Sequence, residues 1–205
     1  MKKALFLAVV FLGFVVFFSL SALAITIGFE PVSQEVVVGN PASVNLVISG
    51  LGDGTYPSLG GFDLFIEYDP AILALSDISF GDSTLGDQLD VSGDGSYYDH
   101  SSHSSNVEYL FGLSYNLPWD LNDLQKPSFV LATLTFDTLS VGTSSLEIVN
   151  PDPPIYVSRL SDELGNALGF ERESGSVSPV PEPATFILIG FGLGGIGILR
   201  RRKVI

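Results

Sequence analysis

The sequence predicts an all-β fold, an antiparallel sandwich of two sheets, with a signal peptide before it and a short transmembrane helix after it. Three observations predict this arrangement. Apolar and polar residues alternate along much of residues 25–180, which is typical of half-buried strands. No amphipathic helical stretch separates the alternating segments, so neighbouring strands are expected to pair antiparallel. Each end of the chain carries an apolar run beside basic residues.

The first 24 residues are typical of a secretory signal peptide. Lys2 and Lys3 form a positively charged start, an apolar run follows over residues 4–18, and the small residues Ala22 and Ala24 form the expected cleavage site. We expect signal peptidase to cut after Ala24, so that the protein is exported. An uncleaved N-terminal anchor is the alternative, and the serines that follow the apolar run disfavour it.

The last segment, residues 178–205, combines a proline-rich motif, an apolar run and a basic end. The motif is Pro181, Glu182 and Pro183, and residues 185–199 are predicted to form the transmembrane helix. At about 1.5 Å per residue that helix spans roughly 22 Å, less than the ~30 Å of a bilayer core. By the positive-inside rule the basic end stops in the cytoplasm, and the rest of the chain faces the periplasm. This membrane stop consists of Arg200, Arg201, Arg202 and Lys203.

This three-part C-terminus resembles the PEP-CTERM sorting signal. The resemblance implies that the chain is held for a time in the inner membrane and cut near the motif by an exosortase. It would then be delivered to the cell surface or the extracellular space. An ordinary C-terminal anchor with a proline-bounded linker is the alternative. The signals at the two ends of the chain agree on export.

Between the two signals lies a strongly acidic domain, expected over residues 25–177. Residues 25–180 contain 22 acidic and three basic residues, a formal charge of −19. This charge argues against nucleic acid as a partner, because nucleic-acid binders present basic surfaces. The chain contains no cysteine, which excludes disulfide scaffolds, cysteine-bound zinc and thiol catalysis.

The predicted strands follow one another between turn signals rich in Gly, Asn, Asp and Pro. Their alternating apolar positions are Ile25, Ile27 and Phe29; Val44, Leu46 and Ile48; Phe62, Leu64, Ile66 and Tyr68; Val107, Tyr109, Phe111 and Leu113; Val130, Ala132, Leu134 and Phe136; and Leu146 and Ile148. The segments 61–70, 131–136 and 160–165 resemble cohesin-like domains. The resemblance implies a jelly-roll sandwich of about nine strands, related in fold to carbohydrate-binding modules, and a shared fold does not transfer function.

No set of residues predicts catalysis, and we expect that the protein is not an enzyme. Its carboxylates fall mainly on polar strand faces and in Gly/Ser loops, where solvent would prevent the raised pKa that a glycosidase acid needs. No cofactor is expected except a Ca²⁺ ion considered for the acidic loop 82–99, with Asp87, Asp90 and Asp94 as ligands; a solvated loop is the alternative. His100 and His103 lack a third ligand, so chance explains their spacing better than a metal site.

Aromatic residues in the predicted loops are the candidates for ligand binding. Trp119, beside Asp120, is the strongest, and Tyr98 and Tyr97 lie in the predicted loop 81–106. Exposed rings flanked by polar groups stack on sugars. The alternative is that Trp119 closes one end of the sandwich, since Trp is usually largely buried, and this is the favoured interpretation.

These observations predict a non-catalytic exported protein that acts as a structural or interaction module in extracellular polysaccharide or a biofilm matrix. Its expected partners during export are signal peptidase, exosortase and the inner membrane. Afterwards they are extracellular polysaccharide or surface proteins. A carbohydrate-binding protein with a defined glycan ligand is the alternative.

Overall fold

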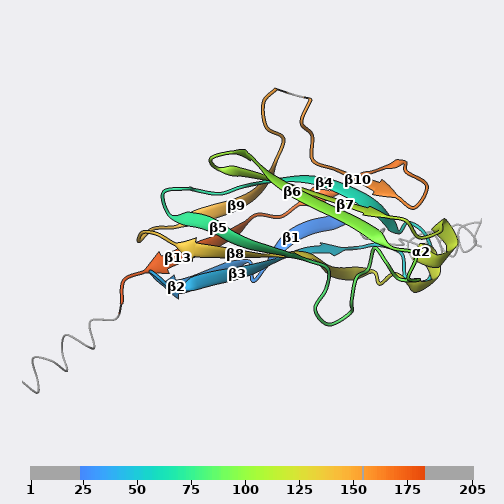
Figure 1. Cartoon of the computed structure of the whole chain (residues 1–205), viewed down its shortest axis with the longest axis horizontal. Helices are drawn as coiled ribbons and strands as arrows, with labels where there is room; N and C mark the ends of the chain where they lie inside the picture. Colours follow the sequence, from blue (N-terminus) through green and yellow to red (C-terminus); the bar gives the residue numbers. More distant parts are fainter. Residues whose placement is uncertain (1–23, 154, 183–205) are drawn as a thin grey trace, which may run out of the picture.

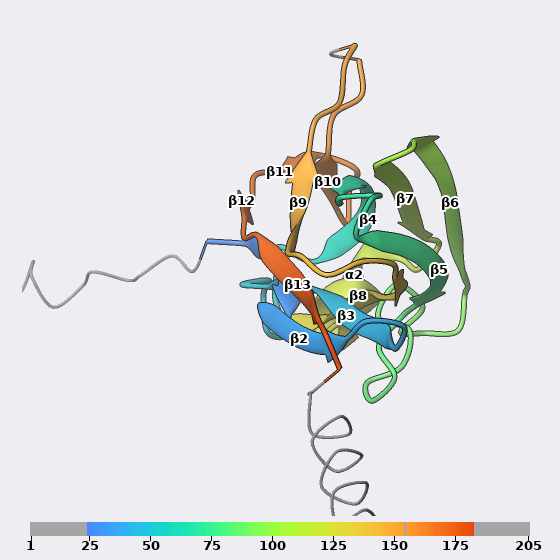
Figure 2. The same cartoon turned by 90° about the vertical axis from the view of Figure 1, so that its left-hand side faces the viewer.

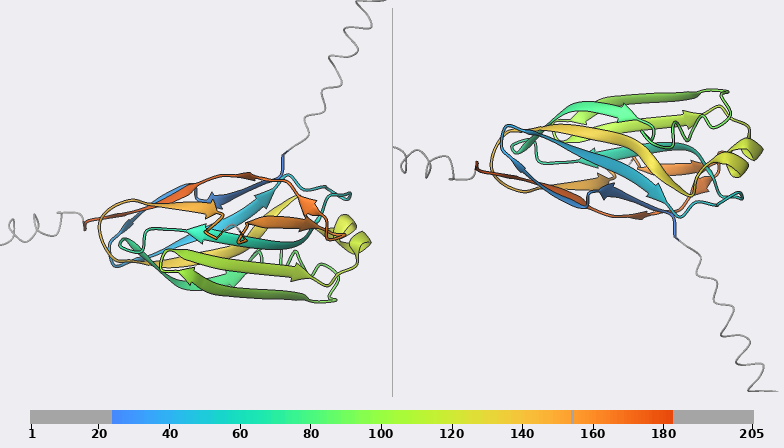
Figure 3. Two further views of the ribbon diagram at one scale, coloured as in Figure 1. Left: turned by 90° about the horizontal axis from the view of Figure 1, so that it is seen from above. Right: turned by 90° about the horizontal axis from the view of Figure 1, so that it is seen from below.

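Two β-sheets packed face to face make up the part of the protein that the computed structural model describes, residues 24–153 and 155–182 (Figures 1 and 3). The first sheet has the strand order β12 (Glu171–Arg172), β1 (Thr26–Glu30), β3 (Pro41–Ser49), β8 (Ser128–Thr138) and β5 (Leu73–Phe80). β3 pairs with β8 over its whole length, and these two strands form the centre of the layer.

The second sheet is built around β4 (Leu59–Glu67). On one side of β4 lie β7 (Val107–Ser114) and then β6 (Ser96–Ser104). The other side of β4 is shared by two groups of strands. Beside the end of β4 lie β9 (Ser144–Val149), β13 (Gly175–Val180) and β2 (Ser33–Val37), in that order. Beside its beginning lie β10 (Arg159–Asp162) and then β11 (Ala167–Leu168). The short helix α2 (Pro118–Leu124) lies at the end of the sandwich opposite the C-terminal end of β13 (Figure 1).

The core lies between the two sheets and extends in sequence from Ile25 to Val177. Inward positions of the central strands hold fully buried side chains such as Leu46, Leu64 and Phe136. Burying a side chain of this size contributes about 1.5–3 kcal/mol to stability. Because this cluster already spans both sheets, we expect the domain to fold without the two terminal segments.

The fold class predicted from the sequence is confirmed, with two exceptions to antiparallel pairing. β1 runs parallel to β12, and β2 runs parallel to β13. Each pair joins strands from opposite ends of the domain, so most of the chain serves as the long connection that a parallel pair requires. Two-residue strands such as β11 and β12 raise the strand number above the predicted one.

For β7 the sequence predicted the wrong face for the core, because Tyr109, Phe111 and Leu113 were expected to point inward. Leu110 and Glu108 point into the sandwich and are buried. Gly112 belongs to the same inward set, because a side chain there would collide with the ring of Phe62. The alternation misled because β7 carries large apolar residues at consecutive positions. Its outer face holds Tyr109, Phe111 and Leu113.

Two segments expected to be irregular are regular in the structure. Residues 96–104 form β6, and residues 118–124 form α2. β6 is an edge strand that pairs with β7, so most of its side chains are exposed and it shows no apolar alternation. α2 has seven residues, too few to display a helical period.

The sandwich covers the predicted domain, residues 25–177, and its last strand extends three residues into the predicted C-terminal segment 178–205. Its first strand begins at Thr26, just after Ala24, and its last strand ends at Val180, just before Pro181. No helix within residues 24–153 or 155–182 combines the length and apolar character needed to cross a membrane. The predicted transmembrane helix 185–199, Ala22, Pro183 and the basic cluster 200–203 lie outside the described residues.

Candidate functional site

One edge of β4 is shared between two strands, and this arrangement places a loop on the outer face of the second sheet. β9 pairs with the end of β4, and β10 pairs with its beginning. Between these strands, residues 150–153 and 155–158 leave the sheet and stand out from the sandwich (Figures 1 and 2). The loop therefore rises beside the middle of β4.

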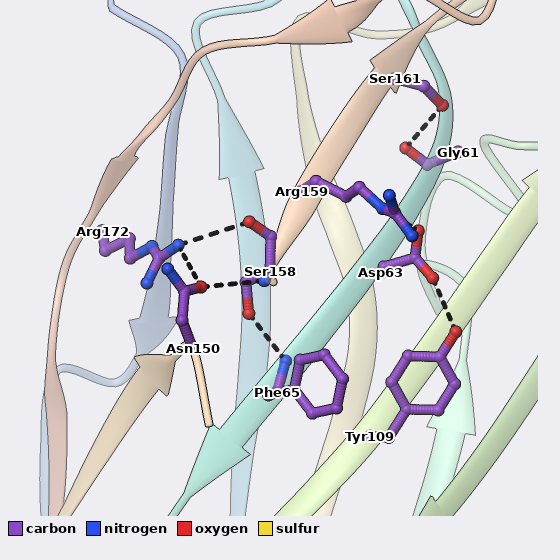
Figure 4. Close-up of polar contacts among 9 residues, drawn as sticks. All are labelled: Gly61, Asp63, Phe65, Tyr109, Asn150, Ser158, Arg159, Ser161 and Arg172. Carbon is purple, nitrogen blue, oxygen red and sulfur yellow. Dashed lines mark hydrogen bonds and ion pairs between the residues drawn. The ribbon is translucent and has the colours of Figure 1, made fainter. Parts of the chain in front are cut away.

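Three polar side chains fix the base of this loop (Figure 4). Ser158 donates its hydroxyl to the carbonyl of Val149 at 2.7 Å and accepts the amide N–H of Phe65 at 3.0 Å. The second bond satisfies the buried amide of Phe65 at the point along β4 where its neighbour changes from β9 to β10. The amide of Ser158 donates to Oδ1 of Asn150 at 2.9 Å, and Arg172 donates to the same oxygen at 2.8 Å.

Asp63 links three strands on this face (Figure 4). Its Oδ2 accepts a hydrogen bond from Nε of Arg159, its cross-strand partner on β10, at 2.9 Å. Its Oδ1 accepts the hydroxyl of Tyr109, on β7, at 2.6 Å. Burial, together with the bonded carboxylate of Asp63, raises the pKa of Tyr109, so the phenol stays a donor. The Arg159 side chain is 70% exposed, so the ion pair orients these groups more than it stabilises the fold.

A cleft of about 470 Å³ opens beside this network, between the loop and the strands β4, β6 and β7. Phe65 lies at its base and is only 5% exposed, because three rings cover it. Their centroids lie 5.0 Å (Tyr109), 5.4 Å (His103) and 5.9 Å (Tyr156) from that of Phe65. Ile155, on the loop side, is 76% exposed.

The aromatic surface continues from the cleft across β7 and β6. Tyr97 lies beside Phe111, with ring centroids 6.0 Å apart, and it is paired in the ladder with Leu113. Tyr97 remains 47% exposed. We call this surface the aromatic face, and it consists of Phe65, Tyr97, Tyr109, Phe111 and Leu113.

The outer face of the first sheet has a different chemistry. Most of its outward positions on β3 and β8 are polar, apart from Pro41 and the paired Val47 and Val130, and several of the polar side chains bond to one another across the strands. The hydroxyls of Ser43 and Thr135 lie 3.3 Å apart, and Thr133 donates to Asn45 at 2.8 Å. A sandwich needs no aromatic outer face for stability, since the first sheet does without one. The aromatic face therefore points to binding.

The three aromatic residues predicted to bind a ligand lie in three different settings. Trp119 is 61% exposed at the start of α2, so the favoured interpretation that it is buried is wrong; α2 buries Leu121 instead. The ring of Tyr98 stacks on Phe80 with centroids 4.8 Å apart, so it is packed rather than free. Tyr97 alone of the three belongs to the aromatic face.

The three predicted calcium ligands are each bound to protein groups. Asp87 accepts the hydroxyls of Ser96, at 2.5 Å, and Tyr98. Asp90 accepts a backbone N–H at 2.8 Å, and Asp94 accepts a serine hydroxyl at 2.8 Å. In the part of the chain that the structure describes, no three His, Asp or Glu side chains are grouped to hold a metal ion. The calcium site stays a prediction and gains no support from this geometry.

The two histidines lie in separate environments. Nδ1 of His100 lies 3.2 Å from the buried carboxylate of Glu108, between the edges of the two sheets. His103 lines the cleft on the outer face, where its ring packs against Tyr156 with centroids 4.5 Å apart. A register shift in the β6–β7 ladder after Ser102 separates them.

Sequence reasoning missed the cleft, although one signal for it was present. Phe65 is a large apolar side chain at an outward position of β4, whose inward positions Phe62, Leu64 and Ile66 are already apolar, and Tyr109 lies opposite it on the same face of β7. A strand that is apolar on both faces is covered on both faces or binds something. The partnership of Asp63 with Arg159 was not visible, because 96 positions separate them in the chain.

Comparison with known proteins identifies the C-terminal segment. Residues 179–203 match the family model of the PEP-CTERM protein-sorting motif, so the resemblance seen in the sequence is confirmed. The chain is therefore an exported protein with a C-terminal sorting signal of the kind directed to an exosortase. The matched segment begins within β13, whose last residue is Val180. No curated protein matches the chain.

Solved structures with similar folds include several cohesins. The sixth cohesin of scaffoldin B from Acetivibrio cellulolyticus, solved in complex with a dockerin, has a TM-score of 0.59 and 15% identity, over 77% of this chain and 99% of that chain. A cohesin module of a family 33 glycoside hydrolase from Clostridium perfringens has a TM-score of 0.57 and 16% identity, over 78% and 98%. A non-cellulosomal cohesin from Archaeoglobus fulgidus has a TM-score of 0.55 and 15% identity, over 80% and 96%. These likenesses show a cohesin-like fold.

Proposed function

We propose that this protein is a non-catalytic interaction module of an extracellular matrix, sorted to the surface by an exosortase and held to a matrix component by its aromatic face. Signal peptidase would cut after Ala24, and the exosortase would cut near Pro181, Glu182 and Pro183. The membrane-held form would be transient and would face the periplasm.

The observation that carries the binding role is the contrast between the two outer faces. The two sheets pack against each other through one shared core, so both have their inner faces covered. Their outer faces differ, since one is rich in hydroxyl groups and the other is aromatic. Partly exposed aromatic rings are the side chains that most often anchor binding interfaces. The fold supports the same role, since one similar cohesin was solved with a bound dockerin.

The chemistry of the cleft supports a binding role over a catalytic one. Both oxygens of Asp63 already accept hydrogen bonds, from Arg159 and from Tyr109. A glycosidase needs a second carboxyl group at a defined separation from the first. Among the described side chains that line the cleft, Asp63 carries the one carboxyl group, so the cleft does not present the pair that a glycosidase needs.

The experiment is a fractionation of the producing cells. We expect the double variant Tyr97→Ser/Phe111→Ser to be exported and processed normally but to appear in the soluble medium rather than in the matrix. The matched control is Ser43→Ala/Thr135→Ala on the outer face of the first sheet, which should stay in the matrix. If the Tyr97/Phe111 variant is retained as well as the wild type, the aromatic face does not hold the protein.

A further inference from the structure

We propose that the cleft between β4, β7 and the loop before β10 binds a neutral saccharide. This inference rests on the proposed function, because it names the class of matrix component that the aromatic face would hold. It places the sugar site at Asp63, Arg159 and Tyr156, away from Trp119.

The size and walls of the cleft fit a short stretch of a glycan. Its volume of about 470 Å³ lies in the range of small-molecule sites, which is roughly 300–1,000 Å³. The rings of Tyr156 and His103 form one wall, and Tyr156 is 37% exposed. Sugar rings present C–H groups on their faces, and these pack against aromatic side chains.

The cleft also offers unused hydrogen-bonding groups. The terminal nitrogens of Arg159, the hydroxyl of Ser101 and the ring nitrogens of His103 have no hydrogen-bond partner among the described residues. Each oxygen of Asp63 accepts one bond and has capacity for another. Sugar hydroxyls both donate and accept, so one ligand would satisfy donors and acceptors together.

These polar groups are held in place before any ligand arrives. Asp63 is fixed from two sides by Arg159 and Tyr109, and the loop that carries Tyr156 is fixed at its base by Ser158. A site whose groups are already oriented loses less conformational entropy on binding. The arrangement is therefore a formed site rather than a chance depression.

Charge and polarity select a neutral saccharide over two other ligands. The positive charge of Arg159 is balanced by Asp63, and the domain as a whole carries −19 over residues 25–180, so acidic glycans would be repelled. An apolar side chain of a partner protein would cover Asp63 and Arg159 without bonding to them. The terminal nitrogens of Arg159 would then lose water without gaining a hydrogen-bond partner, a cost that a sugar hydroxyl avoids.

The test uses the exported protein purified from the producing cells. Linear trisaccharides of glucose, mannose and galactose are titrated by calorimetry up to about 10 mM, because a single shallow site is expected to bind weakly. Trigalacturonate serves as the acidic counterpart. We expect at least one neutral trisaccharide to bind and trigalacturonate to bind less. Amide NMR shifts on binding should cluster at Phe65, Ser101 and Tyr109.

Matched variants separate the cleft from the rest of the surface. Arg159→Ala and Tyr156→Ala should weaken binding about tenfold or more, because each removes a direct contact. Lys126→Ala, which removes one positive charge outside the cleft and the aromatic face, should bind like the wild type.

Two outcomes would overturn the inference. One is that no neutral trisaccharide binds at about 10 mM, and the other is that shifts cluster away from the cleft. If the Tyr97→Ser/Phe111→Ser variant leaves the matrix while no sugar binds, the aromatic face holds a protein partner. In that case the proposed function stands and the saccharide assignment fails.

Discussion

The side chain of Gln125 bonds to both main-chain groups of Leu59, as a neighbouring strand would. Oε1 of Gln125 accepts the N–H of Leu59 at 2.6 Å, and Nε2 donates to the carbonyl of Leu59 at 3.0 Å. Nε2 also donates to the carbonyl of Gln88 at 2.8 Å. Gln125 is 3% exposed and directly follows α2, so this one amide fixes α2 against the start of β4.

Gln125→Ala should lower the free energy of unfolding by about 2–4 kcal/mol, because it leaves the buried polar groups of Leu59 without partners. Asp123→Ala, an exposed change in α2, should alter it by less than about 0.5 kcal/mol. Urea denaturation measures both. Equal midpoints for the two variants would show that the Gln125 bonds do not matter.

The phenol of Tyr109 should ionise at higher pH than an exposed tyrosine. Burial and the carboxylate of Asp63 raise its pKa above the ordinary value of about 10. A group with a raised folded pKa stabilises the fold below the unfolded pKa, and this contribution is lost as pH rises through the folded pKa. The melting temperature should therefore fall above about pH 10.

The Asp63→Asn variant tests the electrostatic part of this effect, because it keeps the size of the side chain and removes its charge. In a spectrophotometric alkaline titration, one tyrosine of this variant should ionise earlier than in the wild type. Tyr109→Phe should remove the same late-ionising group. If Asp63→Asn leaves the titration curve unchanged, Asp63 does not act on Tyr109.

Asp87 should matter for stability whether or not calcium is present. Asp87→Asn weakens the bonds from Ser96 and Tyr98 and should cost about 1–2 kcal/mol even in chelator. Asp94→Asn, at an exposed loop position, should cost little. If the two variants and Asp90→Asn lose stability equally, and only when Ca²⁺ is present, the three carboxylates form the calcium site predicted from the sequence.

Replacing Pro181, Glu182 and Pro183 together by alanine should leave the protein in the inner membrane. The apolar run 185–199 would remain attached, since the exosortase no longer recognises the motif. Immunoblots of membrane and extracellular fractions measure this. The N-terminal sequence of the trapped form should still begin at Ile25, because signal peptidase acts at the other end. Release of the triple variant in trimmed form would refute the sorting role of the motif.

The sequence predicted the sandwich because period-two alternation reports directly which side chains face a core. It succeeded for β1, β3 and β4, where Ile27, Leu46 and Leu64 are buried. It failed for β7, where Tyr109 and Leu110 are both large and apolar and the alternation could be read in either register. Which face of such a strand points into the core depends on the strands that pack beside it, and these are not visible in the local sequence.

The candidate site was less accessible to sequence reasoning than the fold. Its polar centre joins residues 96 positions apart, and they meet only because Arg159 is in register with Asp63 across the β4–β10 ladder. Tyr98 and Trp119 were chosen for their residue type in apparent loops. Tyr98 proved to be packed on Phe80, and Trp119 lies exposed on a helix that was not predicted.

The central claim is that the aromatic face holds the mature protein to the matrix. Its most direct measurement is a binding isotherm of fluorescently labelled exported protein on matrix isolated from cells that lack the gene. The wild type and the Ser43→Ala/Thr135→Ala control should bind saturably with the same midpoint. The Tyr97→Ser/Phe111→Ser variant, with an unchanged melting temperature, should show no saturable component. Saturable binding by that variant with the wild-type midpoint would contradict the account.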